Sequence, residues 1–165
     1  ENAGEQGDFA YSFDMAREAG LRLTTHAGEW RGPEEVRAAV RDLRVERVGH
    51  GVRVIEDLAL VDRLAEDGIT LEVCPGSNVT LGVYPIWDQH PIQKLRERGV
   101  KVTVSTDDPP FFHTTMTREY EELERAFGWG AADFHEISQT ALAAAFCDED
   151  TKAKIAKRLE DHPHE

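Results

Sequence analysis

Two adjacent carboxylates, Asp107 and Asp108, follow a run of alternating β-branched residues that is typical of a strand. Pro109 and Pro110 come next, and proline cannot continue the hydrogen-bond ladder of a sheet. Both acids are therefore predicted to lie where a buried strand opens into a loop, although Asp-Asp-Pro-Pro is also common in turns and at helix starts. Carboxylates in that position could bind a metal ion or carry protons.

Two earlier predicted strands also end in polar side chains. Residues 21–25 run into His26, with Glu29 three residues later, and residues 46–50 end in His50. Because parallel strands bring their carboxyl ends to one edge, these groups could share a site. Imidazole and carboxylate are ligands that zinc accepts, and bound zinc lowers the pKa of water enough to give hydroxide near neutral pH. In such a site Glu29 could carry protons and His50 could orient the attacking water.

Strand and helix patterns alternate four times, which predicts an α/β fold of parallel strands with right-handed crossovers. The other two predicted strands are residues 69–73 and 102–106. The predicted helices are residues 9–19, 57–67, 117–127, 133–146 and 149–159, with two more that begin at Pro33 and Pro91. Part of a (β/α)8 barrel and an open doubly wound sheet both fit this pattern, but the chain has no GxGxxG or P-loop motif.

Composition limits the partners and the compartment. The 165 residues suffice for one domain, and 40% of them are hydrophobic. A net charge of −13 argues against nucleic acids and anionic membranes as partners. The two cysteines form no CxxC motif, no apolar run is long enough to span a bilayer, and no signal-peptide pattern is present, so we expect a cytoplasmic protein.

Several chemically capable residues have simpler interpretations. Cys74 is expected to be a small core residue. The imidazole of His90 is expected to lie at the surface or to cap a helix. The charges of residues 119–125 are expected to form a solvated helix face. Any single histidine, including His50, is more often structural than catalytic, so the functional interpretation depends on the coincidence of three strand ends.

Four motifs, in this order, resemble the successive signatures of the adenosine deaminase family of metal-dependent amidohydrolases. They are Thr25-His26-Ala27-Gly28-Glu29, Val48-Gly49-His50-Gly51, Cys74-Pro75-x-Ser77-Asn78 and Ser105-Thr106-Asp107-Asp108-Pro109. The resemblance covers essentially the whole chain. It implies a (β/α)8 barrel that holds one Zn²⁺ and hydrolyses adenosine to inosine and ammonia.

The resemblance also implies a role for each matching residue. His26 and Asp107 would be zinc ligands, Glu29 the proton shuttle to the purine ring nitrogen, and His50 the group that positions the attacking water. Asp108 and the Gly4 backbone would contact the purine, so that the substrate-binding residues are Gly4 and Asp108.

One family feature is missing ahead of His26: the His-x-His pair that supplies two more zinc ligands. The only such pair, His162-Pro163-His164, comes at the other end of the chain. We therefore expect residues 1–165 to form a single partial domain, the C-terminal part of a (β/α)8 TIM barrel with extra C-terminal helices, lacking the N-terminal strands. Two ligands hold zinc poorly, so the isolated chain should be inactive, and its open sheet edges favour self-association.

The sequence leaves several functions open. Adenosine is the expected substrate, with adenine and aminofutalosine-type nucleosides as alternatives. A generic zinc hydrolase and a non-catalytic half-barrel that binds a partner also remain. Cytidine-deaminase chemistry, which uses HxE with PCxxC, is rejected because Pro75 follows Cys74 and the chain has no CxxC.

Overall fold

The computed structural model describes residues 4–161 and divides the chain into two compact units. Unit 1 comprises Glu1–Val73 with Pro91–Lys101, and unit 2 comprises Cys74–His90 with Val102–Glu165. The His162-Pro163-His164 pair lies outside the described residues. Among the described helices, none has the length and apolar content that crossing a bilayer requires.

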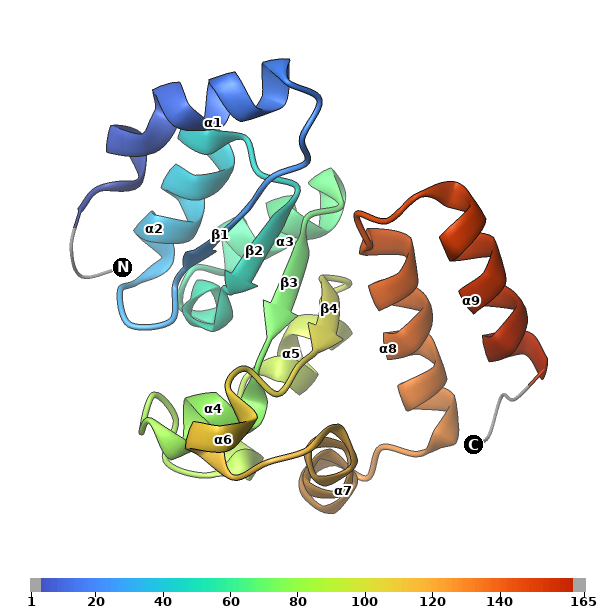
Figure 1. Cartoon of the computed structure of the whole chain (residues 1–165). Coiled ribbons are helices and arrows are strands. Elements are labelled where there is room, and N and C mark those ends of the chain that lie inside the picture. The colour runs from blue at the N-terminus through green and yellow to red at the C-terminus, as the bar shows by residue number, and fades with distance from the viewer. Residues whose placement is uncertain (1–3, 162–165) are drawn as a thin grey trace. The chain divides into compact units, whose positions relative to one another are not determined.

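Four short strands form one parallel sheet in the order β1-β2-β3-β4 (Figure 1). They are β1 (Thr24–Ala27), β2 (Arg47–His50), β3 (Thr70–Val73) and β4 (Lys101–Val104). The register pairs His26 of β1 with Gly49 of β2. Alternation of strand and helix along the chain, with sequential strands as neighbours, is the pattern of a (β/α)8 barrel, so the predicted α/β class is confirmed.

The helices of unit 1 begin and end at the signals that the sequence carries. They are η1 (Gln6–Phe9, 3-10), α1 (Ala10–Glu18), α2 (Pro33–Ala38), η2 (Ala39–Leu43, π), η3 (Val52–Glu56, 3-10), α3 (Leu58–Asp67) and α5 (Ile92–Glu97). Asp57 caps α3 by accepting a hydrogen bond from Leu60 N at 3.1 Å, and Gly68 ends it in the left-handed conformation. Fully buried Val36, Leu43, Val48, Val61, Leu64 and Leu71 form the core.

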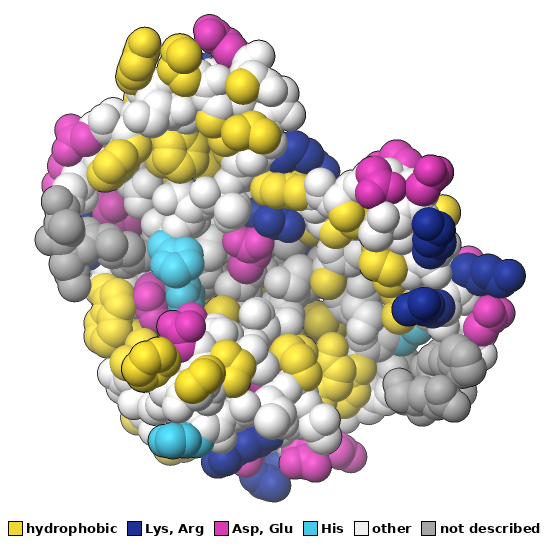
Figure 2. Space-filling view, viewed as in Figure 1, with side chains coloured by type: hydrophobic (Ala, Val, Ile, Leu, Met, Phe, Trp, Pro, Cys, Tyr) yellow, Lys and Arg dark blue, Asp and Glu magenta, His cyan; other side chains and the backbone are white. Residues whose placement is uncertain are grey.

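Unit 1 also exposes large hydrophobic side chains. Phe9, Tyr11 and Met15 are more than half exposed, and so is Leu21 beyond the end of α1. Figure 2 shows the hydrophobic surface over this helix. Nothing in α1 itself is buried, so this helix contributes little to the core of unit 1.

Unit 2 holds two short helices that are not among the helices expected from the sequence. It contains α4 (Pro75–Thr80), η4 (Trp87–Gln89, 3-10), α6 (Pro109–Phe112), α7 (Met116–Phe127), α8 (Ala131–Ala144) and α9 (Glu149–Asp161). Both α4 and α6 begin at a proline, where the missing N–H costs nothing. Three longer helices follow, as predicted, and Leu123, Trp129 and Ile137 are buried among them.

Candidate active site

His26 is the first of the two predicted zinc ligands along the chain, and its ring packs directly against β2. A Cβ placed on Gly49, its partner across the ladder, would lie only 2.3 Å from His26 Cδ2. The ring also meets that of His50 edge-on, with centroids 5.0 Å apart. A glycine at position 49 is therefore required for the His26 ring to occupy this place.

Glu29 and His50 form a second contact in the same unit. Glu29 is 7% exposed and His50 is 2% exposed, and Glu29 Oε2 lies 3.6 Å from His50 Nε2. Gly28, with a φ of +69°, turns the chain after β1, and Gly51 N donates to Ala27 O at 3.0 Å. The structure thus brings the imidazoles of His26 and His50 and the carboxylate of Glu29 together at the carboxyl ends of β1 and β2.

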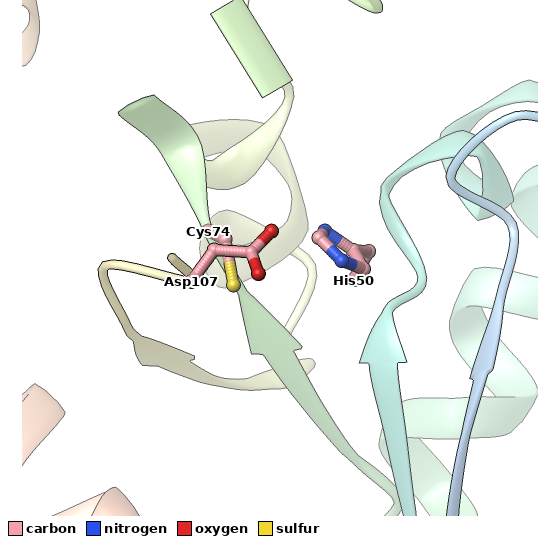
Figure 3. A group of neighbouring side chains, drawn as sticks. All are labelled: His50, Cys74 and Asp107. Atoms are coloured by element: carbon pink, nitrogen blue, oxygen red, sulfur yellow. The ribbon is translucent and has the colours of Figure 1, made fainter. Parts of the chain in front are cut away.

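Asp107 lies three residues beyond β4, in unit 2. Its Oδ2 accepts a hydrogen bond of 2.8 Å from Ser77 Oγ, and an oxygen of its carboxylate lies within 4.8 Å of Cys74 Sγ. Figure 3 draws Cys74 and Asp107, and it also labels His50 at the end of β2. The Asp108 carbonyl accepts the first hydrogen bonds of α6, from Phe111 N and Phe112 N.

Two of these residues, His50 and Asp107, adopt a backbone conformation that residues other than glycine rarely adopt. His50 has a φ of 59° and Asp107 a φ of 60°, both in the left-handed region. Such conformations cost about 1–3 kcal/mol each and cluster at functional sites. Gly4, by contrast, is an exposed residue, and the atoms nearest to a Cβ placed there belong to Phe9 and Asp8.

Glu119 is the exception to the solvated face expected on α7, where Glu121, Glu124 and Arg125 are exposed. It is fully buried, its Oε2 accepts a hydrogen bond of 2.9 Å from Gly76 N, and its Oε1 accepts one of 2.7 Å from Thr114 Oγ1. The signal in the sequence was its spacing, four residues before the buried Leu123, which puts both on one face of the helix.

His90 is the C-cap residue of η4, in line with the capping alternative, but its side chain does not lie at the surface. It is 2% exposed, its Nε2 lies 3.2 Å from Asn78 Oδ1, and its ring meets that of Tyr84 edge-on. Buried polar groups need hydrogen-bond partners, and here the His90 imidazole and the Asn78 side-chain oxygen are partners of each other. Cys74 is buried, as expected.

The titration of Glu119 gives a testable pH dependence. Burial raises the pKa of this carboxyl above its ordinary value of 4.5, against the lowering effect of the hydrogen bonds from Thr114 and Gly76. The folded state therefore holds the proton more tightly than the unfolded state, and the stability this contributes is complete below pH 4.5 and is lost as the pH rises through the folded-state pKa.

We accordingly expect the free energy of unfolding of the parent protein to fall, relative to that of the Glu119→Gln variant, as the pH rises above 4.5. Urea unfolding of both proteins over a series of pH values measures this difference. A difference that is constant with pH would contradict the prediction.

Comparison with known proteins connects this arrangement to a family. The family model described as adenosine deaminase matches residues 1–162. The chain belongs to the adenosine deaminase family. The resemblance in the four motifs is confirmed, and the match extends well beyond them.

The relatives are named for one substrate. An adenine deaminase of Rhizobium rhizogenes is 53% identical over 159 residues, which cover 96% of this chain and 49% of that protein. An adenine deaminase of Agrobacterium fabrum is 50% identical over 161 residues, covering 98% of this chain and 50% of that protein. The chain thus spans about half the length of the curated relatives it matches.

Solved structures of the family have the same fold. The crystal structure of an adenine deaminase from Arthrobacter aurescens matches with a TM-score of 0.92 at 29% identity, covering 98% of this chain and 49% of that one. An amidohydrolase from Burkholderia ambifaria, solved with bound Zn, matches with a TM-score of 0.88 at 31% identity, covering 99% and 46%. The four-stranded parallel sheet is therefore part of a (β/α)8 barrel.

Proposed function

We propose that this chain forms part of a zinc-dependent deaminase that hydrolyses adenine to hypoxanthine and ammonia. The observation that carries the proposal is the name shared by relatives about half identical to it over nearly its whole length, adenine deaminase. Adenosine, the substrate expected first from the sequence motifs, has less support than adenine, the alternative. The reaction is the same in either case: water replaces the exocyclic amino group of the purine.

The donor groups of the chain fit a zinc ion. His26 offers an imidazole and Asp107 a carboxylate, both common zinc ligands. The His26 ring packs over Gly49, which has no side chain to displace it. The Asp107 carboxylate accepts a hydrogen bond from the Ser77 hydroxyl. Zinc bound by such ligands lowers the pKa of a water molecule and so supplies a nucleophile near neutral pH.

The residues of unit 1 would carry out the proton transfers. Glu29 Oε2 and His50 Nε2 are 3.6 Å apart, so a reacting atom could lie about 3 Å from both. In the proposed reaction His50 holds the attacking water by a hydrogen bond. Glu29 delivers a proton to the ring nitrogen beside the reacting carbon, and the amino group leaves as ammonia. Asp108 and the Gly4 backbone are the proposed purine contacts.

Ammonia release from adenine and from adenosine by the full-length protein tests the substrate. We expect kcat/KM for adenine to exceed that for adenosine on the order of 10²-fold or more, since a site shaped for the free base must exclude ribose. Chelation should lower the rate by about 10³-fold, as several kcal/mol of charge stabilisation are lost, and zinc should restore it. Turnover that favours adenosine, or that survives chelation, would overturn this proposal.

A further inference from the structure

The first turn of α4 is held at three consecutive residues, all within unit 2. Gly76 N donates to Glu119, Ser77 Oγ donates to Asp107, and Asn78 Oδ1 lies against His90. Gly76, Ser77 and Asn78 are all buried. The hydroxyl that touches Asp107 is therefore flanked on both sides by residues with buried polar partners.

Glu119 contacts this turn with unusual closeness. A Cβ placed on Gly76 would lie 2.2 Å from Glu119 Oε1, so the carboxylate rests directly on the backbone. A fully buried carboxylate carries a desolvation cost that an apolar side chain of the same size would avoid. Its two hydrogen bonds, from Gly76 N and Thr114 Oγ1, offset part of that cost and fix the carboxylate in one orientation.

We propose that Glu119 is a positioning residue for the metal site: it fixes the Gly76 amide, which sets the place of Ser77, and Ser77 in turn orients the carboxylate of Asp107. The proposal rests on the proposed function, in which Asp107 is a zinc ligand. Groups that orient metal ligands from outside the coordination sphere typically change metal affinity by about 10–100-fold when removed. Ser77 would orient the Asp107 carboxylate directly, whereas Glu119 would act on it indirectly, through the backbone of α4.

Zinc affinity of the full-length protein, measured by competition with a chelating indicator, tests this route. We expect Glu119→Ala and Ser77→Ala each to weaken zinc binding about 10–100-fold. Because both act through the same hydroxyl, the double variant should lose little more than Ser77→Ala alone. Glu119→Gln should keep most of the affinity, since its amide oxygen can still accept from Gly76 N and its amide nitrogen can donate to Thr114. Glu124→Ala, an exposed acid on the same helix, is the matched control and should leave zinc affinity unchanged.

A second measurement needs no metal. Hydrogen exchange of the Gly76 amide should become faster in Glu119→Ala and stay slow in Glu124→Ala, because only the first loses the acceptor. A Gly76 amide that stays protected in Glu119→Ala overturns the inference. So does a double variant whose loss of affinity is the sum of the two single losses, which would indicate general destabilisation. A parent protein that binds no zinc overturns the proposed function, and this inference falls with it; zinc binding that Glu119→Ala leaves unchanged overturns the inference alone.

Discussion

Replacing Gly49 by alanine is expected to weaken zinc binding and to lower kcat/KM by about 10²-fold or more, because the new methyl group would occupy the place of the His26 ring. The Cβ would lie 2.3 Å from His26 Cδ2, closer than real Cβ contacts come, and 3.1 Å from Nε2. The ring must move, and a displacement of about 1 Å in a reacting group can cost about 10²-fold. Forcing a side chain into a packed site also costs about 1–3 kcal/mol of stability.

Zinc content, turnover of adenine and urea unfolding of the full-length protein together measure this effect. Gly7→Ala is the matched control in the same unit, since a Cβ there meets its nearest neighbour, Asp42 Oδ2, at an ordinary 3.9 Å. That variant should bind zinc and turn over adenine like the parent. A Gly49→Ala protein with parental zinc content and turnover would show that the place of His26 does not depend on this glycine.

Replacing Glu29 by glutamine should lower kcat by about 10²–10⁴-fold while zinc content stays as in the parent. The amide has the shape of the carboxylate and can still reach His50, 3.6 Å away in the parent, but it cannot deliver a proton. Since Glu29 is proposed as a proton carrier and not as a ligand, the metal should remain bound.

The matched control for this variant is Glu66→Gln, which changes an exposed acid of α3 in the same unit. Steady-state turnover and metal analysis of both proteins give the comparison. If Glu29→Gln lost zinc together with activity, Glu29 would belong among the metal ligands. If it lost neither, proton transfer would have to be assigned to another group.

The sequence was informative wherever a local pattern decides the structure. Alternating β-branched residues marked the strands, Pro33 marked the start of α2, and Gly68 marked the end of α3. The polar residues at three strand ends could be recognised because parallel strands place such residues at one edge. Strand bounds were less exact: the first strand was expected at residues 21–25 and lies at Thr24–Ala27, where β2 supplies its hydrogen-bond partners.

Features that depend on distant partners could not be predicted. The spacing of Glu119 from Leu123 hints at its burial, but its hydrogen-bond donor, Gly76, lies 43 residues earlier and could not be identified from the sequence. His90 depends in the same way on Asn78. The helix α4 could not be recognised from its composition, because Gly76, Ser77 and Asn78 are typical of turns. The side chains that contact these three residues come from elsewhere in unit 2. The motifs shared by the whole family could not separate adenine from adenosine.

The left-handed backbone at Asp107 costs conformational free energy, but it places a carboxylate that the proposed reaction needs. Glycine adopts a φ of 60° freely, so Asp107→Gly would relieve a conformational cost of about 1 kcal/mol or more, but it would also leave the buried Ser77 hydroxyl without its acceptor, at a cost of about 1–3 kcal/mol. If Asp107 binds zinc as proposed, the strained backbone and the Ser77 hydrogen bond together hold that ligand, so heat-stabilised variants of this protein should be checked at this position first.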